Sequence, residues 1–96
     1  MTYQILFSDL AFRQLKKLEV ATRERIIASL ERIRVRPETY LKKLVGDEGF
    51  RLRAGDYRVI VELDNEKLIV LVLRIGHRKK YMADVRNVAT RYPMNP

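Results

Sequence analysis

The spacing of apolar residues changes along the chain, from helical in the first half to strand-like in the second. Residues 3–7 (YQILF) predict a short strand, and Ser8 is then a suitable helix N-cap. Apolar positions next recur at helical intervals, which predicts one helix over about 9–19 and another over about 21–36. Pro37 is expected to end the second helix, because proline inside a helix removes a hydrogen bond and clashes with the preceding turn.

From Phe50 onward apolar and polar residues alternate, as they do in strands that bury one face. The pattern predicts strands over 50–53, 57–63 and 68–75. The last of these is apolar on both faces and is therefore expected at the centre of the sheet. Asp64-Asn65 predicts a tight hairpin between the second and third of these strands, because both residues tolerate left-handed conformations.

The remaining segments are predicted to be connections and a last helix. Residues 38–48 connect the helical half to the strands, with a helical turn at about 40–44, and the glycines at 46 and 49 predict a turn over 46–49. Gly76 is expected to close the third strand of this half. A final helix is predicted over about 80–91, where Val85 and Val88 supply apolar positions.

This order of elements predicts one α+β domain over residues 1–92, followed by a frayed tail at 93–96 that contains two prolines. An N-terminal strand and two helices precede a three-stranded antiparallel meander and a short C-terminal helix. Sequential hairpins place the helices on one face of the sheet. We expect the other face to be open, concave and basic.

Composition and charge narrow the class of protein. Twenty Lys and Arg against twelve Asp and Glu give a net charge of +8, which attracts nucleic-acid phosphate or an acidic protein. No apolar run is long enough to span a bilayer and no signal-peptide pattern is present, so a cytoplasmic location is expected. The absence of cysteine excludes disulfides, thiolate catalysis and cysteine-ligated zinc.

Conventional catalytic sets are missing from the sequence. His77 is the only histidine, and no glycine-rich loop has the spacing that cradles phosphates. An enzyme built from this chain would have to use Arg, Lys, Tyr and His77. These residue types suffice for RNA cleavage, because RNA supplies its own nucleophile, the 2′-hydroxyl, and arginines stabilise the charge that develops on the phosphate. Neither a metal ion nor another cofactor is required.

Three segments together resemble a known family. They are KLVG at 43–46, FRLRAGDYRVIV at 50–61 and LIVLVLRIGHRKKY at 68–81. They resemble the RelE/ParE toxin superfamily of type II toxin–antitoxin systems, and more closely its RelE-like mRNA interferases. The resemblance implies a RelE-like fold, cleavage of mRNA in the ribosomal decoding site, and silencing by an antitoxin encoded nearby. The expected partners are therefore an acidic antitoxin, the ribosome and mRNA, with no membrane.

The resemblance also implies roles for individual residues. Arg58 matches the arginine that contacts the scissile phosphate, and Arg78 matches a second arginine that stabilises it. Arg51 stands where a strand lysine helps to activate the 2′-hydroxyl, although arginine is a poor proton acceptor. Tyr81 roughly matches a tyrosine that stacks on a base or transfers a proton, and His77 would replace the missing base. Flanking RNA would be bound by Arg53, Arg74, Lys79 and Lys80.

Several alternatives stay open at this point. Arg58 would also suit a structural ion pair with Glu62 on the same strand face, Tyr81 would suit packing of the last helix, and His77 would suit a structural contact. A second lysine of the family's strand falls on Gly49, so it has no counterpart here. A ParE-like inhibitor of DNA gyrase with the same fold, or a weakly active RNA-binding relative, is the alternative function.

Overall fold

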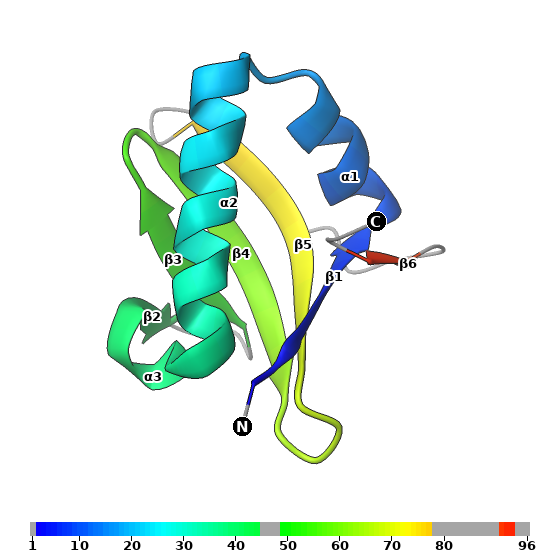
Figure 1. Ribbon diagram of the computed structural model, residues 1–96, viewed down its shortest axis with the longest axis vertical. Helices are drawn as coiled ribbons and strands as arrows, with labels where there is room; N and C mark the ends of the chain where they lie inside the picture. The colour runs from blue at the N-terminus through cyan, green and yellow to red at the C-terminus, as the bar shows by residue number, and fades with distance from the viewer. Residues whose placement is uncertain (1, 45–48, 78–90, 94–96) are drawn as a thin grey trace.

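The computed structural model describes residues 2–44, 49–77 and 91–93 of the 96-residue chain. Three helices lie on one face of a six-stranded sheet whose strand order is β2-β3-β4-β5-β1-β6 (Figure 1). The predicted α+β class is confirmed. In chain order the elements are β1 (Gln4–Ser8), α1 (Asp9–Lys16), α2 (Val20–Val35), α3 (Pro37–Tyr40), β2 (Leu41–Lys43), β3 (Phe50–Ala54), β4 (Tyr57–Asp64), β5 (Ile69–His77) and β6 (Arg91–Pro93).

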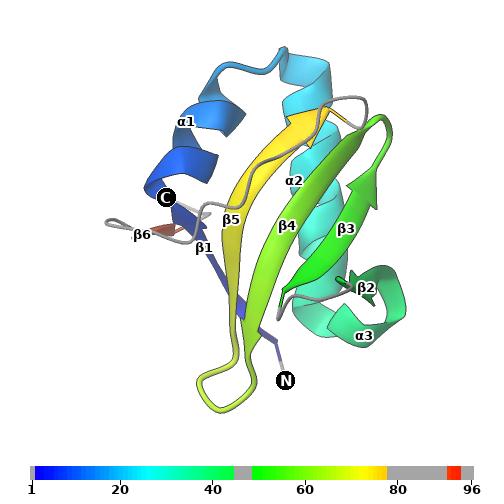
Figure 2. The ribbon, with the colours of Figure 1, turned by 180° about the vertical axis from the view of Figure 1, so that it is seen from behind.

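The sheet is mixed rather than wholly antiparallel. Strands β3, β4 and β5 form the predicted antiparallel meander, and β5 lies inside the sheet as expected. Strand β1 pairs with the other side of β5 in parallel, from Gln4 opposite Ile69 to Phe7 opposite Val72. The chain between these two strands therefore has to cross the sheet, and its helices cover one face while the other faces the viewer in Figure 2.

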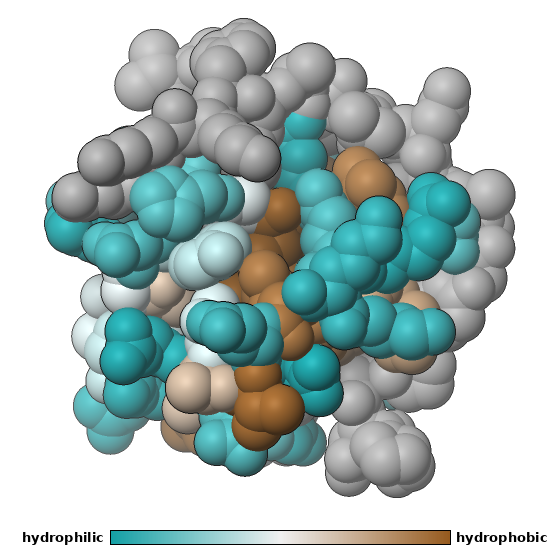
Figure 3. All heavy atoms as spheres, turned by 90° about the horizontal axis from the view of Figure 1, so that it is seen from above, coloured by the Kyte–Doolittle hydropathy of each residue, from teal (hydrophilic) through white to brown (hydrophobic). Residues whose placement is uncertain are grey.

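The core lies between the helices and the sheet. Ile26, Leu30 and Ile33 of α2 have no exposed surface, and they form one cluster with Val59 and Val61 of β4. This confirms the apolar stripe predicted for the second helix. The end of the molecule that carries the α1–α2 connection has a strip of apolar surface between hydrophilic side chains (Figure 3).

Side chains from the last residue of β1 and from α1 continue the hydrogen bonding of β5 after the β1–β5 register ends at Phe7 and Val72. The Ser8 hydroxyl accepts from the Ala11 amide at 3.0 Å, as an N-cap does, and donates to the Leu73 carbonyl at 2.7 Å. Six residues later the Gln14 side-chain oxygen accepts from the Ile75 amide at 2.7 Å. These two side chains take the place of a neighbouring strand along the last part of β5.

The connection after α2 differs from its prediction. Helix α2 does end before Pro37, but Pro37 then begins the short helix α3, because its fixed φ suits the first helical position. The helical turn is therefore at 37–40 and not at about 40–44. Residues 41–43 instead form β2, in which Leu41 is buried opposite Leu52 of β3.

The β4–β5 hairpin also differs from its prediction. Its turn spans residues 65–68, and the left-handed residue is Leu68, with φ 56°, rather than Asp64 or Asn65. Asp64 stabilises the turn by a different route, since its carboxylate accepts from the amides of Glu66 and Lys67 at 3.1 and 3.0 Å.

Strand β5 begins and ends later than expected. It runs past Gly76 to His77, because these two residues pair with Arg58 and Tyr57 of β4. Gly76 is therefore a ladder residue and does not close the strand.

The described C-terminal residues contradict part of the prediction for that end. Residues 91–93 form β6, which pairs antiparallel with β1, where we expected the end of a helix and the start of a frayed tail. The outer edge of β1 offers unpaired backbone groups, and a strand satisfies them better than a helix does. The rest of the predicted helix, the tail at 94–96 and most of the turn at 46–49 lie outside the described residues.

Candidate functional site

The two faces of β4 separate apolar from charged residues, as the alternating sequence predicts. Val59 and Val61 point to the helices and have no exposed surface. Arg58, Ile60 and Glu62 lie on the opposite face. The candidate site is on this second face, which the helices leave uncovered.

Cations collect on this face through cross-strand pairing. Lys42 of β2 is opposite Arg51 of β3, and Arg53 of β3 is opposite Arg58 of β4. Arg74 of β5 is opposite Ile60 and so shares the face. Like charges placed directly opposite each other destabilise a sheet, so this arrangement is unfavourable unless an anion binds between them.

A cavity of about 220 Å³ opens among these cations. Its described lining contains four cationic side chains, two tyrosines and a glycine, and no carboxylate. Within the described part of the chain, Arg51, Arg53 and Arg58 form no ion pair. The cavity is therefore suited to an anion. Its lining residues are Tyr40, Lys42, Arg51, Arg53, Gly55, Tyr57 and Arg58.

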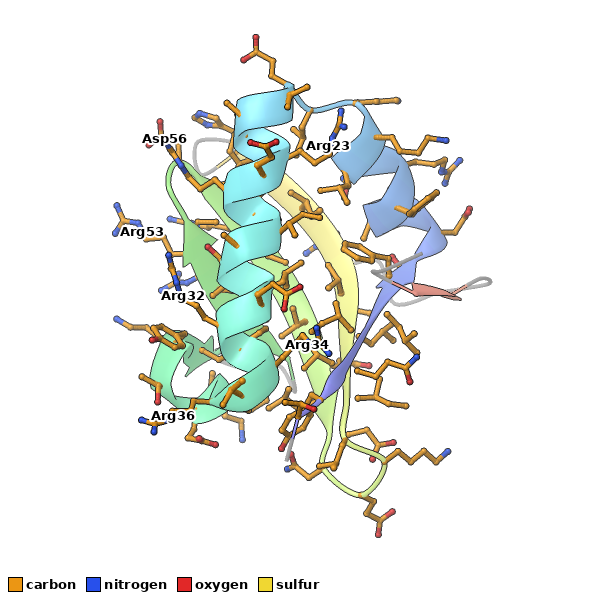
Figure 4. All side chains as sticks on the ribbon, viewed as in Figure 1. Arg23, Arg32, Arg34, Arg36, Arg53 and Asp56 are labelled. Carbon is orange, nitrogen blue, oxygen red and sulfur yellow. The ribbon has the colours of Figure 1, made fainter. Side chains whose placement is uncertain are left out.

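The turn between β3 and β4 sets the spacing of the cations. Gly55 has φ 62°, a left-handed conformation that glycine adopts without the penalty other residues incur. This tight turn brings Arg53 and Arg58 opposite each other, and both side chains are exposed. Arg53 points away from the sheet edge on the side of β3 (Figure 4). A Cβ at Gly55 would lie 2.8 Å from a guanidinium nitrogen of Arg25, so α2 also approaches the turn.

His77 lies beside the cavity but does not line it. Its ring meets the Tyr57 ring edge-on, with centroids 5.3 Å apart and the planes at 75°. Tyr57 is half-buried against the core and also lines the cavity. The described contacts of His77 therefore connect it to the cavity through Tyr57.

The structural alternative for Arg58 is not supported. Glu62 is four residues along β4, which corresponds to roughly 13 Å in a strand. Arg58 has no ion pair within the described residues. Between them on the same face lies a small apolar cluster of Ile60, Leu71 and Leu73. Arg58 is thus oriented toward the cavity and not held by an acid on its own strand.

The structure brings together three of the residues named from the sequence, Arg51, Arg53 and Arg58, while Arg74 shares their face without lining the cavity. Arg78, Lys79, Lys80 and Tyr81 lie outside the described residues. Four lining residues were not among those named, namely Gly55 and Tyr57 of the β3–β4 hairpin and, before it in the chain, Tyr40 and Lys42. For Tyr40 and Lys42 the available signal was Leu41, a buried residue between two polar ones, but three residues are too few to predict a strand.

The described residues contain no group of three or more His, Cys, Asp or Glu side chains that could hold a metal ion. None of the described helices is both long and apolar enough to cross a membrane.

Comparison with known proteins identifies the family. Residues 5–82 match the model for the ParE toxin of type II toxin–antitoxin systems. The chain belongs to this toxin family. It is therefore a member of the RelE/ParE superfamily, as the sequence motifs indicated, and the site described above is the basic face of such a toxin.

Individual relatives agree with this assignment. A RelE-like toxin protein of Escherichia coli is 29% identical over 93 residues, which cover 94% of this chain and 96% of the relative. The mRNA interferase toxin RelE of E. coli K12 is 28% identical over 83 residues, covering 83% of this chain and 87% of the relative. The RelBE2 toxin–antitoxin complex of Mycobacterium tuberculosis contains a similar structure, with a TM-score of 0.75 and 27% identity, covering 81% of this chain and all of that one.

Proposed function

We propose that this toxin acts in the cytoplasm by cleaving mRNA on the ribosome, without a metal ion. The 2′-oxygen of one nucleotide attacks the adjacent phosphorus, the 5′-oxygen of the next nucleotide leaves, and a 2′,3′-cyclic phosphate remains on the upstream fragment. Relatives of 28% identity over most of the chain are named mRNA interferases, which supports this reaction class. The observation that carries the proposal is the cavity lined by four cations and no described carboxylate.

The cavity suits the charge that this reaction develops. Arg58 and Arg53, placed opposite each other, would hold the scissile phosphate and stabilise the extra negative charge of the phosphorane. Arg51, two positions before Arg53 on the same face, would contact the nucleophilic side of that phosphate. Arg78 would provide a second phosphate contact, and Tyr81 or His77 would transfer protons or stack on a base.

The partner that silences the toxin is proposed to be an acidic antitoxin. The similar mycobacterial structure is a complex of toxin and antitoxin. A net charge of +8 and a basic face that the described helices leave open would favour an acidic segment that lies across the cavity. RNA and antitoxin would then compete for the same cations, and flanking RNA would also meet Arg74, Lys79 and Lys80.

The proposal is tested by expressing the chain alone in bacteria and mapping the 5′ ends of mRNA over minutes. The wild type should stop translation and create new ends inside translated codons. Arg58→Ala should reduce the cleavage rate by about 10²- to 10³-fold, as loss of one transition-state contact typically does. The matched control is Arg13→Ala, on α1, because Arg13 is exposed and pairs only with Asp9 in the described structure.

Three other results of this expression experiment would change the proposed function or the role of Arg58. Growth arrest with intact mRNA and DNA-damage signals would replace cleavage by inhibition of DNA gyrase, an alternative favoured by the match to the ParE family model. Full toxicity of a folded Arg58→Ala variant would remove Arg58 from the mechanism. Harmless expression of the folded wild type would leave an RNA-binding relative without catalysis.

A further inference from the structure

Tyr40 is an exposed aromatic residue at the wall of the basic cavity. Its side chain, at the end of α3, is 44% exposed. Val20 and Val35 are the other large apolar residues that stand exposed in the described structure, and neither lines the cavity. The core therefore does not account for Tyr40, whose ring borders a space surrounded by cations.

Lys42 of β2 lies two residues after Tyr40, on the face of the sheet that carries the cavity. It is exposed on β2 and is the cross-strand partner of Arg51. The pair Lys42–Arg51 is followed along β3 by the pair Arg53–Arg58, two positions further on. Two cationic pairs thus follow each other along the sheet. Successive phosphates of an extended single-stranded RNA can each contact one of these pairs.

We propose that Tyr40 and Lys42 bind one nucleotide of single-stranded RNA next to the arginine pair, an inference that rests on the proposed function. The Tyr40 ring stacks on the base, and the Lys42 ammonium contacts its phosphate. An aromatic ring interleaved with cations is the arrangement by which proteins bind unpaired nucleotides. A paired base has no free face for such stacking, and a cavity of about 220 Å³ has no room for a duplex.

The test measures binding of the full chain to two fluorescein-labelled probes by fluorescence anisotropy. One probe is a 2′-O-methyl hexaadenylate, which cannot be cleaved because its 2′-oxygens are blocked. The other is an abasic oligomer of equal length and charge. The wild type should bind the adenylate more tightly than the abasic oligomer. Tyr40→Ala should weaken adenylate binding about tenfold and leave abasic binding unchanged, since stacking is lost and the charges stay.

Controls separate stacking from folding and from general charge. Tyr40→Phe should retain wild-type affinity, because it keeps the ring, and Val35→Ala should do so because Val35 is exposed but does not line the cavity. Lys42→Ala should lower the affinity for both probes. It should also reduce the magnitude of the slope of log affinity against log salt concentration by about 0.7. Lys43→Ala removes one positive charge from the opposite face of β2. It should change neither the affinity for the two probes nor the salt slope.

Each result decides the inference. Adenylate binding that is unchanged in Tyr40→Ala would overturn it, even if mRNA cleavage were observed in cells. Equal losses for the adenylate and abasic probes would also overturn it, because the contribution of Tyr40 to binding would then not depend on a base. If Tyr40→Ala weakened binding of an acidic peptide, such as hexaglutamate, but not binding of adenylate, the surface at Tyr40 and Lys42 would bind a protein partner instead of RNA. If the proposed function were wrong, a different experiment would show it, because the wild type would not cleave mRNA in cells.

Discussion

At the scale of single residues, the site is defined by side chains whose positions cost stability. Arg53 and Arg58 are opposite each other at the end of the β3–β4 hairpin, with no ion pair in the described structure to offset their repulsion. Natural sequences retain such unfavourable arrangements where function requires them. The residue pair is therefore expected to trade stability for anion binding.

Replacing one member of this pair should stabilise the unliganded protein. Arg53→Gln is expected to raise the free energy of unfolding at low salt by about 0.2–1 kcal/mol, because like charges no longer face each other. The gain should shrink in about 1 M salt, which screens exposed charges. Urea unfolding followed by circular dichroism measures both effects. Arg13→Gln, which breaks the exposed pair with Asp9, should show no gain, and an equal gain there would contradict the explanation.

The strand pattern is regular through β3 and β4, and there the sequence predicts which face each side chain occupies. Alternation through β3 and β4 placed Arg51, Arg53 and Arg58 on one face, and the structure confirms that placement. Tyr40 and Lys42 were missed because their position depends on pairing with β3, which is remote in sequence and has no local signature.

At the scale of elements, one edge of β5 forms hydrogen bonds first with a strand and then with side chains. Strand β1 pairs with its first part, and the Ser8 and Gln14 side chains bond its later backbone groups at Leu73 and Ile75. This later part leads to His77 and the basic segment that follows it in sequence. Helix α1 therefore positions the end of the strand on which part of the proposed chemistry depends.

Removing the Ser8 hydroxyl should be costly. Ser8→Ala removes the N-cap of α1 and leaves the buried Leu73 carbonyl without this donor. The two losses together are expected to lower the free energy of unfolding by about 2–4 kcal/mol.

Ser29→Ala is the matched control for this prediction. Ser29 is also buried, but its hydroxyl donates at 3.1 Å to the Arg25 carbonyl one turn earlier in the same helix, which the helix backbone can satisfy. It should cost less than about 1 kcal/mol. Equal losses in thermal or urea unfolding would show that the bond between Ser8 and β5 contributes little.

At the scale of the whole molecule, charge is poorly balanced. The net charge is +8, and the ion pairs Arg13–Asp9 and Arg34–Glu31, in the described part of the chain, both join exposed side chains. Such pairs contribute little to stability. Mutual repulsion of the cations therefore acts on the entire fold and favours an acidic partner or RNA.

Salt should consequently stabilise the free protein. Between about 0.01 M and about 1 M NaCl the Debye length falls from about 30 Å to about 3 Å, which screens the repulsion. The midpoint of urea unfolding is expected to rise steadily over this range. Urea is the suitable denaturant because it adds no ions. A midpoint that falls with salt would mean that attractive pairs outweigh the repulsion.

The local features of this protein follow from its amino-acid sequence alone. Period, capping and turn residues set the two main helices, the β3–β4–β5 meander and the faces of its strands, because these depend on nearby residues. Motifs in the same segments indicated the toxin superfamily, and the family match confirmed it.

Other features depend on neighbours that are distant in sequence and arise only when the chain folds. Residues 41–43 and 91–93 become strands because β3 and β1 offer edges to pair with, and β1 lies parallel to β5 because the helices carry the chain across the sheet. The cavity arises in the same way. Lys42, Arg51 and Arg58 come from three strands, and only the register of the sheet places their charges around one space.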